Sequence, residues 1–111
     1  MANYRITVIK RHSFQDLVDE YVPDHLHPTW GPCGKFTDGQ VFDYKGTPPE
    51  GFCSRAFASI WGDLSVIMCK GDAGWINKPG TMITCCNDGL TPVVFCLERV
   101  EELERVEKEA S

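Results

Sequence analysis

Three cysteines that lie far apart in the sequence share glycine-rich or turn-like surroundings. Cys33 lies in a Gly-Pro-Cys-Gly sequence, Cys53 follows a Gly-Phe pair, and Cys86 precedes an Asn-Asp-Gly turn. Glycine lets the backbone bend around a ligand, and thiolates are soft donors suited to zinc or to iron–sulfur clusters. The pattern therefore predicts that the three thiols converge on one metal site. None of them belongs to a Cys-x-x-Cys motif, so the prediction rests on placement and not on a zinc-ribbon or ferredoxin spacing.

Three thiolates leave one coordination position open, and an open position is typical of chemistry at a metal. Cys85, His25, His27 or a substrate could fill it. The two histidines form a His-x-His pair that could aim both rings at one metal, although loop histidines are commonly only solvated. Cys85 and Cys86 are neighbours in an expected strand, so their side chains should point to opposite faces.

Asp88 is the acidic residue with the clearest chemical context. In an Asn-Asp-Gly turn, an aspartate usually accepts backbone N–H bonds. Because Asp88 follows Cys86 by two residues, its carboxylate could also face the same pocket and exchange a proton there. A structural role is the alternative for the thiols too, since free cysteine is among the most buried residue types. Cys69 and Cys96, which lie in apolar stretches, are interpreted in this way.

The elements around these residues predict an α+β fold, with a small, mostly antiparallel sheet of about four strands packed against one long and one short helix. Alternating apolar residues predict strands, and apolar residues three and four apart predict helices. Residues 1–100 are expected to form one domain, followed by a charged tail over 101–111. Cys53 falls at the start of the long helix, where the helix dipole favours an anion. The expected strands cover 4–10, 40–44, 81–86 and 93–100, and the expected helices cover 14–22 and 52–68.

Composition and charge disfavour several classes of function. The chain has 111 residues, of which 42% are hydrophobic, and a net charge of -5. An acidic protein is a poor ligand for nucleic acid or for an anionic membrane, and no apolar run is long enough to span a bilayer. The N-terminal residues lack the pattern of a signal peptide. A cytoplasmic location is therefore expected, where the six cysteines should be reduced thiols or metal ligands.

The chain resembles a family of short, uncharacterised prokaryotic proteins that are common in anaerobes. The family pattern has an Ile/Val-rich first strand, a Gly-Pro-Cys loop, a Gly-Phe-Cys segment that enters a helix, and a final Cys-x-Asp-Gly-x-Arg-Pro-Val-x-Phe motif. The likeness covers nearly the whole chain before the tail, and the last motif is the most specific. The matching segments are 6–9, 31–33, 51–53 and 86–95.

The resemblance implies that Cys33, Cys53 and Cys86 are the family's signature cysteines, and it brings no established activity. Two departures from the pattern stand out. Thr91 replaces the arginine of the last motif, so the anion contact expected there loses its cation. A Ser-Arg-Ala-Phe sequence replaces a Ser-Trp-Ala-Trp stretch, and its Arg55 could supply the missing charge.

The leading hypothesis is a small cytoplasmic protein that binds an iron–sulfur cluster, most simply a four-iron (4Fe-4S) cluster, through Cys33, Cys53 and Cys86, with zinc as the alternative metal. It would transfer electrons, act as an accessory to a larger redox enzyme, or bind a small-molecule substrate. A second hypothesis is a metal-free thiol enzyme with Cys53 as nucleophile and Asp88 or His25 as base. A third is a non-catalytic interaction module, and the sequence leaves a homodimer open.

Overall fold

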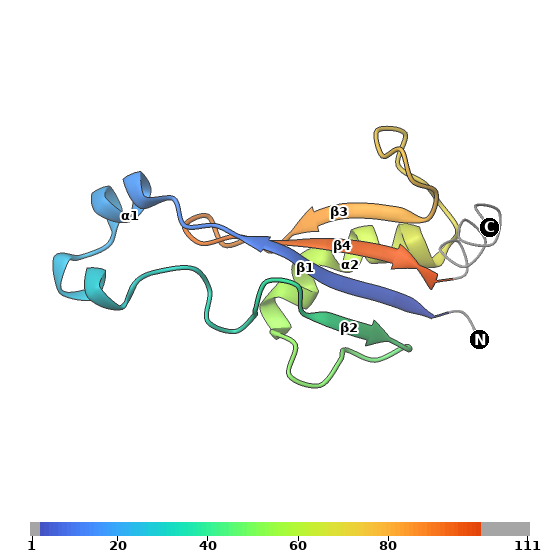
Figure 1. Ribbon diagram of the computed structural model, residues 1–111, viewed down its shortest axis with the longest axis horizontal. Coiled ribbons are helices and arrows are strands. Elements are labelled where there is room, and N and C mark those ends of the chain that lie inside the picture. Colours follow the sequence, from blue (N-terminus) through green and yellow to red (C-terminus); the bar gives the residue numbers. More distant parts are fainter. Residues whose placement is uncertain (1–2, 101–111) are drawn as a thin grey trace.

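The computed structural model describes residues 3–100, so the tail predicted over 101–111 lies outside the described residues. The fold is α+β, as the sequence predicted. An antiparallel sheet has the strand order β2-β1-β4-β3. Figure 1 shows α2 along one face of this sheet and the shorter helices in an extension beyond one end. The strands are Tyr4–Arg11 (β1), Val41–Tyr44 (β2), Thr81–Cys85 (β3) and Val93–Arg99 (β4), and the helices are Gln15–Tyr21 (α1), Asp24–Thr29 (η1, a 3₁₀ helix) and Ser54–Met68 (α2).

The hydrophobic core lies between α2 and the sheet. Every second residue of β4 is buried, as expected for a strand with one covered face. The buried residues of α2 recur at three- and four-residue steps, which places them on a single face of the helix. The two sets meet and bury each other. The fully buried members include Ile6, Val8, Ile60, Leu64, Ile67, Phe95 and Leu97.

A bulge in β1 changes which side chains face this core. The register between β1 and β4 shifts between Val8 and Lys10, so that Arg11 pairs with Val93. Bulges re-aim the residues that follow them. Val93 is buried, and Arg11 comes to the same side of the sheet as its partner instead of continuing the alternation that Ile6 and Val8 begin. The bulge therefore turns the side chain of Arg11, at the end of β1, toward the face of the sheet that α2 covers.

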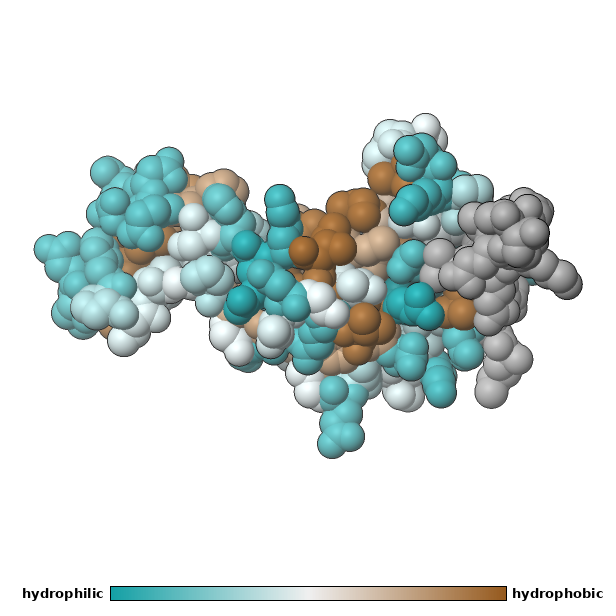
Figure 2. All heavy atoms as spheres, viewed as in Figure 1, coloured by the Kyte–Doolittle hydropathy of each residue, from teal (hydrophilic) through white to brown (hydrophobic). Residues whose placement is uncertain are grey.

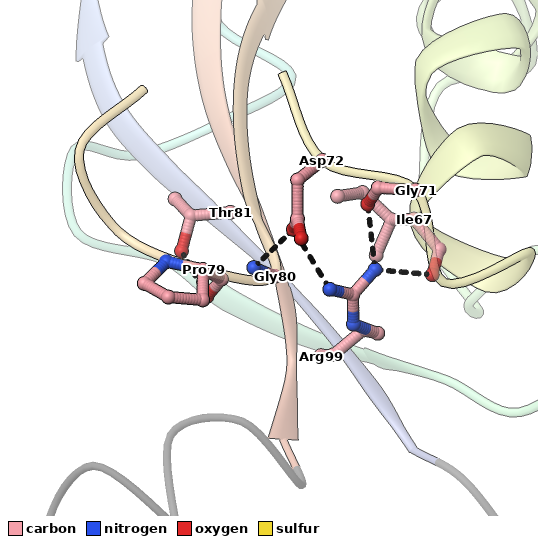
Figure 3. Close-up of polar contacts among 7 residues, drawn as sticks. All are labelled: Ile67, Gly71, Asp72, Pro79, Gly80, Thr81 and Arg99. Atoms are coloured by element: carbon pink, nitrogen blue, oxygen red, sulfur yellow. Dashed lines mark hydrogen bonds and ion pairs between the residues drawn. The ribbon is translucent and has the colours of Figure 1, made fainter. Parts of the chain in front are cut away.

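Arg99 fixes the end of α2 that is remote from Cys53. Its guanidinium donates hydrogen bonds to the carbonyls of Ile67, at 3.1 Å, and Gly71, at 2.7 Å, and pairs with Asp72 at 2.8 Å (Figure 3). The same carboxylate oxygen accepts the backbone N–H of Gly80 at 2.7 Å. The connection between α2 and β3 is thereby tied to the last residue of β4.

The face of the sheet opposite α2 carries no helix within residues 3–100. Two of its hydrophobic side chains, Ile9 and Ile83, line one pocket of about 510 Å³ together with Cys96 and Trp75. Figure 2 shows hydrophobic surface gathered near the middle of the molecule, among polar side chains. Cys96 alternates with the buried residues of β4 and lies on this face, half-buried. Burial, together with the nearby Glu98 carboxylate, raises the pKa of the Cys96 thiol to about 11. Cys96 is therefore a protonated thiol at neutral pH.

The remaining sequence expectations for this part of the molecule have mixed outcomes. Cys69 caps the C-terminal end of α2 and is exposed, so its interpretation as a core residue is wrong. It lies one residue beyond the last turn of the helix, where the chain leaves the core.

In the part of the chain that the structure describes, no helix combines the length and the apolar character that crossing a membrane requires.

Candidate functional site

Cys33, Cys53 and Cys86 line one pocket of about 210 Å³, beside the first turn of α2. Asp88 lines it as well. All three thiols are free and partly buried, so each is within reach of a ligand while being held by surrounding structure. The fold brings together three loop or element-end cysteines that the sequence separates widely. The other lining residues are Lys35, Phe36, Ser54, Arg55, Ala56, Asn87, Thr91 and Val93.

Three phenylalanine rings explain why these segments meet. Phe36 is in the loop of Cys33, Phe52 immediately precedes Cys53, and Phe95 is in β4. The ring centroids lie 5.0 Å apart for Phe36 and Phe52, 5.2 Å for Phe36 and Phe95, and 5.5 Å for Phe52 and Phe95. We call these residues the phenylalanine triad. Each such ring pair adds about 0.5–1.5 kcal/mol beyond the burial of its area, so the triad anchors two cysteine-bearing segments to the sheet.

Arg11 holds the Cys33 loop by its backbone. One terminal nitrogen of its guanidinium donates to the carbonyl oxygens of Cys33 and Phe36, each at 2.9 Å. The Nε atom of Arg11 pairs with Asp38 at 3.0 Å. Sequence reasoning missed this residue, because strict alternation along β1 does not place Arg11 on the inner face. The bulge that reorients it has no signature in the sequence around residue 9.

Cys86 is held by the hairpin between β3 and β4. Its backbone N–H donates to the carbonyl of Val93 at 3.0 Å, and the Val93 N–H donates to the Cys86 sulfur at 3.3 Å. An N–H directed at sulfur compensates negative charge on a thiolate or on a metal-bound sulfur. The hairpin thus supplies both the position of the Cys86 sulfur and a donor for its charge.

Asp88 organises the same hairpin. Its Oδ1 atom accepts the backbone N–H groups of Leu90, at 2.9 Å, and Thr91, at 3.1 Å, and its Oδ2 atom accepts the Thr91 hydroxyl at 3.3 Å. Burial on its own would raise the pKa of Asp88. The hydrogen bonds from Thr91 and Leu90, together with the charge of Arg55, outweigh burial and hold the pKa below its usual value. Asp88 is therefore ionised at neutral pH, and its oxygens serve the turn.

Cys53 occupies the N-cap position of α2, and its carbonyl accepts the N–H of Phe57 at 2.9 Å. Gly51, two residues earlier, has a φ of 80°, which a side chain would strain. The first turns of the helix are tied to the Cys86 hairpin through Asn87. Its side-chain oxygen accepts the Arg55 Nε–H at 3.0 Å, and its backbone N–H donates to the Ser59 hydroxyl at 3.2 Å.

The other candidate ligands are not brought to this pocket. Cys85 is exposed at the end of β3, and His25 and His27 lie in η1, in the extension beyond the sheet (Figure 1). None of the three lines the pocket. His27 instead makes a 2.6 Å contact between its Nε2 atom and the carbonyl of Val22.

The donor set bears differently on the two metal hypotheses. Across residues 3–100, no group of three or more histidine, cysteine or acidic side chains is placed so that it could hold a metal ion. A structural zinc ion needs four ligand atoms in direct contact with it, and no such set is assembled among the described residues. The thiolates of an iron–sulfur cluster bind different irons and stand apart by the width of the cluster. Three thiols that line one pocket are of the donor type that such clusters use.

Comparison with known proteins found no matching family model, no matching curated protein and no matching solved structure.

Proposed function

We propose that the protein binds an iron–sulfur cluster through Cys33, Cys53 and Cys86. The observation that carries this proposal is the lining of one pocket by three thiols from three separate segments. The N–H group of Val93 directed at the Cys86 sulfur supports it, because cluster potentials depend on such donors. A four-iron cluster bound in this way keeps one iron without a cysteine ligand.

The role proposed for the site is electron transfer, or service as an accessory to a larger redox enzyme, in the cytoplasm, where thiols stay reduced. A bound cluster supplies one-electron chemistry and an iron that can accept an external ligand. The protein's own residues hold the sulfurs in place and shield one side of the pocket with Phe36 and Val93. Neither Cys85 nor the η1 histidines line the pocket, so none of them is proposed as a fourth ligand.

The direct test is purification without oxygen, followed by iron and sulfide analysis and visible absorption. We expect about four irons per chain, a brown protein, and loss of iron on replacing Cys33, Cys53 or Cys86 singly by alanine. Cys85→Ala is the matched control, because Cys85 adjoins Cys86 in the chain but does not line the pocket. A colourless wild-type protein without iron or sulfide would contradict the proposal.

A second candidate is a metal-free thiol enzyme in which Cys53 is the nucleophile. The position of Cys53 at the N-cap of a 15-residue helix favours it, since helix N-termini stabilise a negative charge. This candidate requires Cys53 to react with iodoacetamide at pH 7 faster than the more exposed Cys69 does. Equal or slower labelling of Cys53, measured by peptide mass spectrometry, argues against it.

A further inference from the structure

Two cations, Lys35 and Arg55, line the three-cysteine pocket, and neither pairs with a carboxylate among the described residues. Within residues 3–100 the ion pairs are Arg11 with Asp38 and Arg99 with Asp72, and neither Lys35 nor Arg55 takes part in one. The chain as a whole is acidic, with 16 acidic and 11 basic residues. Two cations that line one pocket of an acidic protein, and that pair with no carboxylate among residues 3–100, favour a negative ligand there.

Asp88, the single carboxylate in the pocket lining, is not the missing partner of these cations. Both oxygens of Asp88 accept hydrogen bonds from its own turn, and its low pKa follows from them. The nearby charge of Arg55 contributes to that low pKa without forming an ion pair with Asp88. The lining therefore has one more positive than negative side chain, and the negative one is engaged elsewhere.

Arg55 is oriented for recognition. Its Nε–H is held by the Asn87 side chain at 3.0 Å. No residue among 3–100 accepts a hydrogen bond from the two terminal nitrogens of this guanidinium, which remain available as donors. A guanidinium presents paired N–H groups that match a carboxylate or a phosphate, whereas the ammonium group of Lys35 adds a point charge. Ser54 and Ala56, in the first turn of α2, also line the pocket.

The size of the pocket limits the ligand. Its volume of about 210 Å³ is below the roughly 300–1,000 Å³ of sites that enclose drug-sized ligands. We infer that the pocket binds a small oxyanion, of the carboxylate or phosphate type, between Arg55 and Lys35. This inference rests on the proposed function in one respect, since the anion would be the substrate-class ligand presented to the three-thiol site.

The test is an NMR titration of ¹⁵N-labelled protein, without iron, at constant ionic strength. The probes are inorganic phosphate and malonate, with chloride as the control anion. We expect saturable shifts of the amide signals of Ser54, Arg55 and Asn87 with one or both oxyanions, and none with chloride. Whichever probe binds more tightly identifies the phosphate or the carboxylate as the preferred class. The absence of saturable shifts with both probes would overturn the inference.

Variants distinguish anion recognition by the pocket residues from a general effect of the protein's positive charges. Lys35→Gln and Arg55→Gln should each weaken binding at least about tenfold, the loss expected for one charged hydrogen-bonding partner. Lys10→Gln removes an exposed cation of β1 that does not line the pocket, and should leave binding unchanged. Lys35→Gln leaves the Arg55–Asn87 contact intact, so it keeps the test decisive if Arg55→Gln misfolds. Equal weakening by Lys10→Gln would overturn the inference.

Iron analysis of the same variants keeps the two proposals apart. Oxyanion binding by a protein that never acquires iron would support the inference while the cluster proposal fails. A protein that acquires iron, but whose iron-free form shows no saturable response to either probe, would leave the cluster proposal standing and overturn the inference. If Arg55→Gln loses iron and the wild type binds no anion, the cations serve only to compensate the thiolates, and the inference is again wrong.

Discussion

Replacing Arg11 by methionine should release the Cys33 loop without removing any residue of the pocket. The guanidinium holds two loop carbonyls at 2.9 Å through one nitrogen and pairs with Asp38 at 3.0 Å. Methionine keeps much of the apolar stem and removes every donor. The variant therefore tests whether hydrogen bonds from β1, and not only the phenylalanine triad, place the sulfur of Cys33.

The expected loss of stability follows from these contacts. Hydrogen bonds from a charged donor contribute about 1.5–3 kcal/mol, and here two carbonyls share one nitrogen. The ion pair adds little, because the Asp38 side chain is 59% exposed and such pairs contribute about 0–1 kcal/mol. Arg11 is itself 24% exposed, so water can replace part of what is lost. We expect the free energy of unfolding to fall by about 2 kcal/mol.

Urea denaturation measures that loss, and alkylation of the iron-free protein locates it. The labelling rate of Cys33 should rise at least about tenfold, if most of the loss is local opening of its loop. The labelling rate of Cys86, which the hairpin holds independently, should change little. Lys10→Met is the matched control on the same strand. Unchanged labelling of Cys33, with a stability within about 0.5 kcal/mol of wild type, would refute the assignment of Arg11 as a positioning residue.

Three further outcomes test other parts of the structure. Phe52→Ala should cost about 3 kcal/mol in urea denaturation, since its ring packs against both other members of the triad, whereas Phe14→Ala, at a ring that is 40% exposed, should cost less. The lowered pKa of Asp88 means that its carboxylate stabilises the fold above the unfolded pKa near 3.8, and that this stability is lost as pH falls through the folded pKa. Asp88→Asn should therefore melt at a lower temperature at pH 7 and show a smaller decrease on acidification; an equal decrease would argue against the turn contacts. With a thiol pKa of about 11, Cys96 should be alkylated more slowly at pH 8 than the exposed Cys69, and equal rates would contradict its burial.

The regular elements could be predicted because their causes are local. The apolar spacing that predicted a helix over 52–68 corresponds to α2 at Ser54–Met68, and the alternation over 93–100 corresponds to β4 at Val93–Arg99. Each pattern needs only its own residues and one covered face. The 3₁₀ helix at Asp24–Thr29 has no such pattern to predict it, since it contains Pro28 and buries none of its residues.

The residues that position the site were harder to predict. Phe36 lies in a glycine-containing loop without periodicity, so nothing in its local sequence indicates that it is 3% exposed and packed against three other rings. Arg11 depends on a register shift in β1, which arises from pairing with β4. Both effects come from segments that are distant in the sequence, and neither can be derived from neighbouring residues.

The sequence by itself determined the types of chemistry available: thiols at three flexible places, an aspartate in a turn, and helices and strands set by apolar spacing. Only the tertiary structure decided which of these residues share a pocket. It brought Cys33, Cys53 and Cys86 together with Lys35 and Arg55, and left Cys85 and the η1 histidines elsewhere. The physical reason is that spacing along the chain fixes local conformation, whereas proximity between segments depends on the burial of rings and on hydrogen bonds between elements.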